Sequence, residues 1–179
     1  MDELLTLYPQ NVTQGSPYDT GTQNALTPQF KRIASFLGDY VFQGPRRFFL
    51  QTVSDKQNVW SFCVLHALFR FGLFLTHTFV DSFIVSKRLK LVPILGSFHS
   101  TDLLNIFGGG DLTDFLIQFV TNLDPNGVLS PHWPRYTTSS PQLMTLLGSQ
   151  LEVTNNNRTI TLDTFRVEGI EFITNLSLT

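Results

Sequence analysis

The feature of this chain that most constrains its fold is an apolar stretch over residues 63–85, which carries only Arg70 and Asp81 as formal charges. A membrane-spanning helix needs about 20 predominantly apolar residues. A charge at the centre of such a helix costs roughly 2.5–3.5 kcal/mol on insertion scales. Because His66, His77 and several hydroxyl residues also interrupt the stretch, a buried or interfacial amphipathic helix is favoured over a membrane span.

Composition narrows the class of protein. The chain has 179 residues, which is room for one domain, and its 42% apolar and 15% charged residues exclude a disordered tail. A net charge of −2 argues against the basic surface of a nucleic-acid-binding protein. Cys63 is the one cysteine, which excludes a disulfide within the chain and a cysteine-rich zinc site. The sequence predicts no metal site.

The N-terminus does not resemble a targeting signal. Residues 1–5 are acidic and Pro9 ends the apolar run, whereas a secretory signal needs a basic start and a longer apolar core. Expressed as given, the chain is expected in the cytoplasm. Three glycosylation sequons are nevertheless present, at Asn11, Asn157 and Asn175. A truncated secreted protein would explain this mismatch.

The first third of the chain predicts helices joined by polar segments. In order, the expected elements are helical turns over 2–8, a surface loop over 9–25, a helix over 28–37 and a second helix over 46–52. Thr27 is expected to cap the helix over 28–37. Gly38 and Pro45 are expected to break the helical path, and Phe48 and Phe49 to face a core.

The second half predicts a strand, a helix and a hairpin. The expected elements are a strand beginning at 58–62, a helix from Asp111 to Leu123, a hairpin over 142–162 with its turn at 155–157, and a short helix over 166–172 capped by Asp163. Phe115, Phe119 and Trp133 are assigned to the core, and His132 to the surface or to packing. The glycines at 108–110 favour a helix-entry loop over a phosphate site. Arg46 and Arg47 are expected as solvated ends or ion-pair partners.

A motif at residues 93–102, PILGSFHSTD, resembles the segment that carries the catalytic histidine in type-B carboxylesterases. The best match is to the extracellular lipases of fungi and yeasts. Further segments resemble the same family in order and spacing, namely residues 8–26, 27–50, 124–126, 133–136 and 163–166. The resemblance covers nearly the whole chain outside residues 63–86.

The resemblance implies an α/β-hydrolase whose Ser, Glu and His act in that chain order, without a cofactor. It assigns His99 as the general base and places the chain downstream of both the Ser and the Glu, in roughly the last third of the enzyme. The chain contains no Gly-x-Ser-x-Gly, and none of its four glutamates lies in the context of the family's acid. Asp102 fits a helix cap after His99 better than a substitute acid. Loss of the triad serine alone costs on the order of 10⁶ in turnover, so we expect the chain to be inactive.

The expected fold class is therefore α/β, an incomplete α/β-hydrolase made of helices, one or two sheet strands and a terminal β-hairpin. Residues 1–179 are interpreted as a partial type-B carboxylesterase domain interrupted by an atypical apolar insertion at about 63–86, which we interpret as a translated retained intron or a gene-model error. The resemblance implies a secreted, glycosylated serine esterase acting on esters or lipids. Two alternatives stay open, namely a non-catalytic binding module or pseudoenzyme, and a membrane-associated protein using residues 63–85. Poor solubility is expected for the isolated chain.

Overall fold

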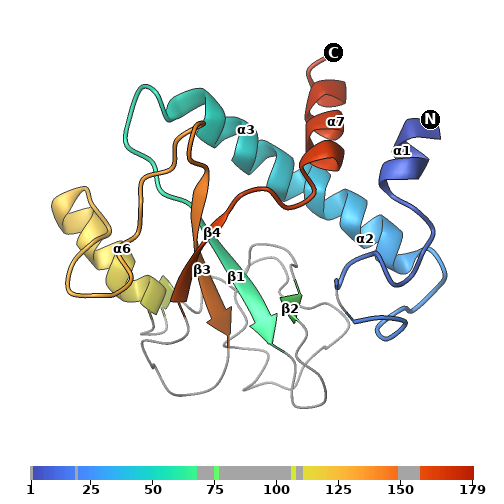
Figure 1. Cartoon of the computed structure of the whole chain (residues 1–179), viewed down its shortest axis with the longest axis horizontal. Helices are drawn as coiled ribbons and strands as arrows, with labels where there is room; N and C mark the ends of the chain where they lie inside the picture. Colours follow the sequence, from blue (N-terminus) through green and yellow to red (C-terminus); the bar gives the residue numbers. More distant parts are fainter. Residues whose placement is uncertain (1, 19, 68–74, 77–105, 108–110, 149–157) are drawn as a thin grey trace.

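The computed structural model describes residues 2–18, 20–67, 75–76, 106–107, 111–148 and 158–179. Within them a small mixed sheet is flanked by helices (Figure 1). A long helical run crosses above the sheet, one helix lies at the left, and two short helices, one near each end of the chain, lie at the right. The molecule is thus of the α/β class, as the sequence predicts. None of the helices in these residues is long and apolar enough to cross a membrane.

The sheet has four strands in the order β2-β1-β3-β4. The strands are β1 (Phe62–Ala67), β2 (Leu75–Thr76), β3 (Gln142–Gly148) and β4 (Arg158–Leu162). β1 runs parallel to β3, with Phe62 opposite Met144, while β2 and β4 are antiparallel to their neighbours. The predicted pairing of the 142–162 hairpin is confirmed as β3 with β4, and its turn at 155–157 lies outside the described residues.

β1 corrects the expectation for the start of the apolar stretch. The sequence favoured a helix from residue 63, but Cys63–Ala67 continue a strand, in which Cys63–His66 pair with Thr145–Gly148 of β3. The adjacent strand β3 offers a full ladder of hydrogen-bonding groups, so the backbone of these residues is satisfied in the sheet. The remainder of the stretch, apart from Leu75–Thr76 in β2, lies outside the described residues.

The long helical run is continuous where the sequence predicted breaks. Its parts are α2 (Phe30–Gly38), a π-helix η1 (Asp39–Gln43) and α3 (Gly44–Val53). The wide π turn bonds the Gly44 N–H to Asp39 O, and Pro45 therefore falls in the first turn of α3, where a missing N–H is tolerated. The predicted Thr27 cap is also wrong, because α2 begins two residues later than expected and Gln29, which precedes it, makes no side-chain cap.

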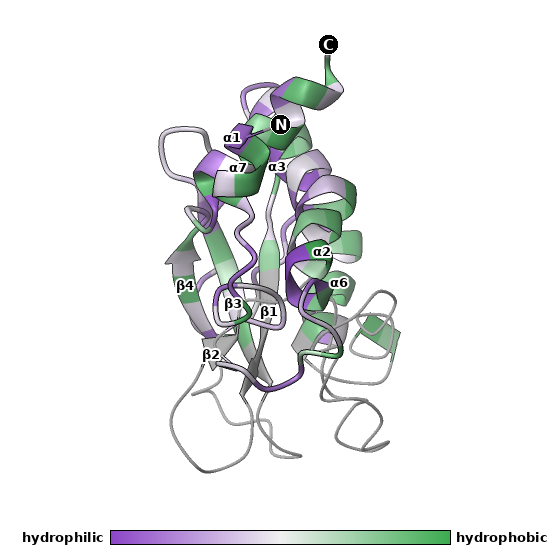
Figure 2. Ribbon diagram, turned by 90° about the vertical axis from the view of Figure 1, so that its right-hand side faces the viewer, coloured by the Kyte–Doolittle hydropathy of each residue, from purple (hydrophilic) through white to green (hydrophobic). Residues whose placement is uncertain are grey.

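The amphipathicity of this run is inverted relative to an ordinary surface helix. Its buried residues are mostly small, polar or charged, namely Lys31, Ser35, Gly38, Asp39, Gly44, Arg47 and Leu50. Its large apolar side chains are exposed, namely Ile33, Leu37, Tyr40, Val41, Phe48 and Phe49, with 43–55% of each surface accessible. The expectation that Phe48 and Phe49 face a core is therefore wrong. Figure 2 shows hydrophobic positions recurring along the side of the run turned away from the strands.

The core lies where α6 (Asp111–Asn122) and α3 meet the sheet. One cluster joins Leu112 and Phe115 of α6 to Trp133, Met144 and Leu146. A second joins Leu50, Val59, Tyr136 and Leu143. Because side chains alternate along a strand, Leu143 and Met144 reach opposite faces of β3, so the sheet packs on both sides. The predicted core roles of Phe115 and Trp133 are confirmed, whereas Phe119 is 39% exposed and makes an edge contact with Trp60.

The chain ends with α7 (Val167–Ser177), which packs against η1 and α3, so the β-hairpin is not the terminal element. This helix is longer than the predicted 166–172 and begins without a side-chain cap. The expected cap, Asp163, instead forms ion pairs with Arg46 and Arg47. The residue before the helix, Arg166, adopts left-handed backbone angles of φ 50° and ψ 37°.

Candidate functional site

The catalytic candidate His99 lies outside the described residues, as do Asp102, the glycines at 108–110 and Asn157. The assignment of His99 as general base therefore stays a prediction. His132 is exposed, as expected. The other two sequon asparagines, Asn11 and Asn175, are both exposed. The arrangement of these candidates therefore stays untested, and the described residues form a framework of helices and sheet.

One part of this framework is a buried carboxylate, Asp163, held between two arginines of α3. Arg46 donates from Nη1 to Oδ2 and from Nη2 to Oδ1, each at 2.9 Å. Arg47 donates from Nη2 to Oδ1 at 2.7 Å. The two-point contact of Arg46 is the strong, directional form of this interaction. We call these three residues the Asp163 cluster, which fastens the segment after β4 to the helical run.

The Asp163 cluster holds the segment after β4 against the helical run and is not suited to proton transfer. Burial raises the pKa of Asp163, but the hydrogen bonds and charges of Arg46 and Arg47 outweigh burial and hold this pKa below its usual value. Both carboxylate oxygens are already occupied by guanidinium donors. Asp163 therefore cannot serve as a free general base, and the second of the two roles predicted for Arg46 and Arg47, ion-pair partner, is confirmed.

A second buried ion pair joins η1 to the start of α7. Arg166 Nε donates to Asp39 Oδ2 at 2.7 Å, and the Tyr8 hydroxyl donates to the same oxygen at 2.8 Å. The guanidinium carbon of Arg166 also lies 4.6 Å from the ring centroid of Tyr8 and 5.2 Å from that of Tyr18. We call these four residues the Arg166 cluster. It connects Tyr8, which directly follows α1 (Asp2–Leu7), and the loop after it to η1 and to the start of α7.

Burial dominates the electrostatics of the Arg166 cluster. Desolvation raises the pKa of Tyr8 and of Tyr18, and the nearby charge of Asp39 raises each pKa further. Burial also raises the pKa of Asp39, although Arg166 opposes that effect. The cluster therefore keeps both phenols protonated at any physiological pH. Neither tyrosine can therefore act as a base, because its phenol keeps its proton.

Lys31 is a third buried polar anchor, with 0% of its surface exposed. Its Nζ donates to Thr20 Oγ1 at 2.7 Å and to the carbonyl of Gly21 at 2.9 Å. The loop preceding α2 therefore folds around this ammonium group. Gly15 of this loop packs closely against Lys31, since a Cβ at position 15 would lie only 2.6 Å from the Lys31 backbone.

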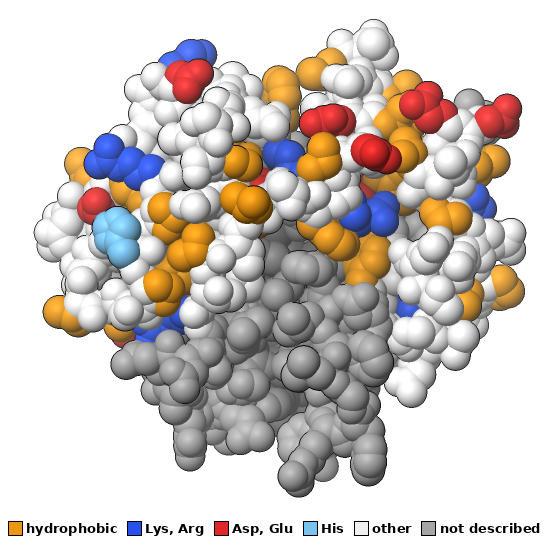
Figure 3. Space-filling view, viewed as in Figure 1, with side chains coloured by type: hydrophobic (Ala, Val, Ile, Leu, Met, Phe, Trp, Pro, Cys, Tyr) orange, Lys and Arg blue, Asp and Glu red, His pale blue; other side chains and the backbone are white. Residues whose placement is uncertain are grey.

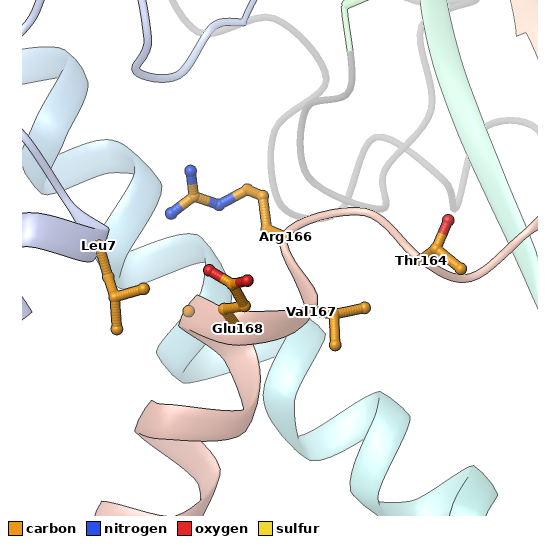
Figure 4. A pocket seen from close by; sticks show the side chains of 6 residues that line it. Leu7, Thr164, Arg166, Val167 and Glu168 are labelled. Atoms are coloured by element: carbon orange, nitrogen blue, oxygen red, sulfur yellow. The ribbon is translucent and has the colours of Figure 1, made fainter.

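An open hollow of about 300 Å³ lies at the start of α7. Leu7, Thr164, Arg166, Val167, Glu168 and Gly169 line it. Figure 4 shows the Arg166 guanidinium and the Glu168 carboxylate on the same side of the helix start, with Leu7 facing them from α1. The lining holds no serine, cysteine or histidine. Among the described residues no three His, Cys, Asp or Glu side chains are grouped for metal binding.

On the described face seen in Figure 3, acidic and basic side chains are interspersed with hydrophobic ones. This face therefore shows no patch of one charge sign that would attract a charged ligand. This agrees with the net charge of −2. The described residues therefore form a scaffold that contains the Asp163 and Arg166 clusters and no catalytic group of side chains.

Comparison with known proteins finds relatives of this chain among lipases. Lipase 2 of Geotrichum candidum is 34% identical over 99% of this chain, and lipase 5 of Diutina rugosa is 40% identical over 76% of it. The chain is related to the fungal and yeast lipases. A secreted triacylglycerol lipase of Gibberella zeae is 32% identical over 95% of the chain. No family model matches the chain.

The chain spans only about a quarter of the length of these lipases, namely 28% of the Geotrichum protein, 22% of the Diutina protein and 26% of the Gibberella protein. The resemblance to fungal and yeast lipases found at the PILGSFHSTD motif is thereby confirmed. Lipase relatives imply an α/β-hydrolase fold, and the mixed sheet with its flanking helices agrees with a part of such a fold.

The sequence interpretation missed the buried charges at Lys31, Asp39 and Arg166. A signal for two of them was present, because Lys31, Ser35 and Asp39 follow one another at four-residue intervals and so share one side of a helix. The sequence analysis assigned no role to that side of the helix. The position of Arg166 could not be inferred, since its partner Asp39 lies 127 residues away.

Proposed function

We propose that this chain is the histidine-bearing C-terminal part of a carboxylic-ester hydrolase, and that it is inactive on its own. The observation that carries the proposal is the 34% identity to a lipase over 99% of the chain, which includes the PILGSFHSTD motif. The proposal assigns residues 1–179 to one partial hydrolase domain. Extracellular location of the complete protein follows from the relatives that are named as secreted lipases.

In the complete site, His99 is the general base of a Ser-Glu-His triad. Its imidazole takes the proton of the serine hydroxyl as the oxygen attacks the ester carbonyl, and returns the proton to the departing alcohol. Water then hydrolyses the acyl-enzyme by the same proton transfers in reverse order. The serine, the acid and the oxyanion hole belong to the part of the relatives that this chain does not match, so His99 here has nothing to activate.

The inverted helical run supports an incomplete fold. A face carrying Ile33, Leu37, Val41 and Phe48 in water costs free energy that burial would recover, at roughly 25 cal/mol per Å² of apolar surface. Polar side chains of the same run are already buried in the Asp163 and Arg166 clusters. The exposed face therefore fits a second layer supplied by the rest of a longer hydrolase.

The insertion at 63–86 is the other departure from the family. Because Cys63–Ala67 occupy β1, deletion of residues 63–85 would bring residues 86–90 into the same positions beside β3. Those five residues, SKRLK, are the ones that follow the Trp60-Ser61-Phe62 strand in the family resemblance. A strand is thus available with or without the insertion, and the proposal treats the form without it as the functional one.

A chimaeric lipase tests this proposal. The segment of Geotrichum candidum lipase 2 that matches this chain is replaced by residues 1–179 lacking 63–85, and hydrolysis of p-nitrophenyl esters is measured. We expect turnover, and we expect His99→Ala to reduce it by orders of magnitude while His132→Ala, at an exposed position, leaves it unchanged. Thermal melting of the variants controls for folding. Turnover that survives His99→Ala in a folded chimaera would refute the assignment.

A further inference from the structure

We propose that Asn11 is an N-glycosylation acceptor of this chain and that Asn175 is not. Both asparagines belong to sequons and both are exposed, so neither the motif nor accessibility separates them. The difference lies in what the sequon hydroxyl does at each position. The inference rests on the extracellular route given under the proposed function, because the transfer of the sugar takes place in that route.

At Asn11 the sequon folds onto itself. The acceptor side chain accepts two hydrogen bonds at Oδ1, from the Thr13 hydroxyl at 2.8 Å and from the Thr13 N–H at 3.0 Å. The Asn11 carbonyl accepts from the Gln14 N–H at 2.9 Å, which closes the turn. All of these contacts lie within four residues, so the turn does not depend on the rest of the fold and can form in the nascent chain.

This geometry favours the chemistry of transfer. Donation from the Thr13 hydroxyl to Oδ1 draws electron density toward the carbonyl and makes the amide nitrogen easier to deprotonate. The donor is an oligosaccharide linked to a lipid pyrophosphate. Nδ2 forms a bond to the sugar C1 as the bond from C1 to the pyrophosphate oxygen breaks, its electron pair leaving with the lipid pyrophosphate. Nδ2 loses one proton to a base of the transferase, and no oxidant or reductant is needed.

In the Asn175 sequon, the Ser177 hydroxyl does not contact the acceptor amide but bonds to the backbone. The sequon lies in the last turns of α7, and the Ser177 hydroxyl donates to the Ile173 carbonyl at 2.8 Å rather than to the acceptor amide. The Asn175 carbonyl accepts from the Leu178 N–H. Helical backbone places the side chains of positions i and i+2 on different sides of the helix, so hydroxyl and amide do not face each other. The third sequon, Asn157, lies outside the described residues.

The test is translation of the full chain behind an appended signal sequence into microsomes, with Asn157→Gln as the background. Modification is read as a gel shift that endoglycosidase reverses, and the site is read by mass spectrometry of the peptides. We expect one glycan, lost in Asn11→Gln and in Thr13→Val and retained in Asn175→Gln. A glycan that persists in Asn11→Gln, or a background chain that carries no glycan, would overturn the proposal.

A helix-breaking variant tests the reason given for Asn175. Glu171 is exposed in the middle of α7, and Glu171→Pro removes a helical hydrogen bond there. In the Asn157→Gln chain this change should add a second glycan at Asn175, while an unmodified Asn175 would contradict the helix as the cause. His99→Ala should leave every glycan in place, so the failure of this inference and the failure of the proposed function give different results.

Discussion

Arg47 Nη2 lies 2.7 Å from Asp163 Oδ1, and the two side chains are only 5% and 2% exposed. The pair joins α3 to the segment between β4 and α7 across 116 positions of sequence. Arg46, whose side chain is partly exposed, binds the same carboxylate. The sheet and the helical run are thus tied by a buried charge as well as by the apolar contact of Leu50 with Leu143.

Removing the carboxylate should destabilise the fold strongly. Asp163→Asn leaves two arginines near a neutral amide, and breaking a buried ion pair by removing one partner costs about 3–5 kcal/mol. Urea unfolding followed by tryptophan fluorescence should show a lower midpoint. Asp55→Asn, at an exposed acid, is the matched control and should leave the midpoint unchanged. A midpoint for Asp163→Asn equal to that of the control would show that the pair is not stabilising.

Acid should weaken the chain through the same carboxylate. The pKa of Asp163 in the fold is lower than the value of about 3.9 in an unfolded chain. Its contribution to the free energy of unfolding is therefore complete above that value and is lost as the pH falls through the lower, folded pKa. Unfolding measured from pH 7 down to pH 2 should show this loss below about pH 4 in the wild type. In Asp163→Asn the slope over the same interval should be smaller, and equal slopes would contradict the assignment.

Three buried tyrosines should titrate at higher pH in the folded chain than in the unfolded chain. Burial raises the pKa of Tyr8, Tyr18 and Tyr136 above the ordinary value of 10.0, so the folded chain holds these protons longer than the unfolded chain. Stability is then lost as the pH rises above about 10. The phenolate absorbance of these residues near 295 nm should therefore rise at higher pH than in the unfolded chain and complete its rise with unfolding. In 8 M urea all four tyrosines should titrate together near pH 10, and the same curve without urea would contradict buried phenols.

The exposed face of the helical run should make the isolated chain self-associate. Ile33, Leu37 and Phe48 are each 43–51% exposed, and contiguous apolar patches of this kind favour aggregation. The triple change of these residues to Glu should shift size-exclusion elution toward the monomer. Val128→Glu, at a 97% exposed apolar residue outside the run, should elute as the wild type does. A sharp monomer peak from the wild-type chain would contradict the expectation.

The sequence predicts those elements whose determinants are local. The spacing of Leu112 and Phe115 predicts α6 and the burial of these two residues, because a helix brings residues three and four apart onto one face, whereas Phe119 of the same stripe is exposed. The 142–162 hairpin is also predicted from local features, namely two strand-like segments and a turn-forming interval between them. α1, over Asp2–Leu7, agrees with the predicted turns over 2–8.

Other features depend on partners far away in the chain, and local patterns misled there. Asp163 before a helix has the pattern of a cap, but two arginines more than 110 positions away compete for it. Phe48 and Phe49 have the composition of core residues, but the side of α3 that meets the sheet is set by Arg47 and Leu50. His99 lies outside the described residues, so its role remains a prediction.

Ester hydrolysis by the purified chain tests whether residues 1–179 are inactive alone. The chain of residues 1–179 and its His99→Ala variant are assayed side by side with p-nitrophenyl esters and with a fluorophosphonate probe for activated serines. We predict no turnover above the buffer rate and no labelled serine in either protein. Turnover by the chain that His99→Ala abolishes would show a working site in these residues and would contradict the proposed inactivity.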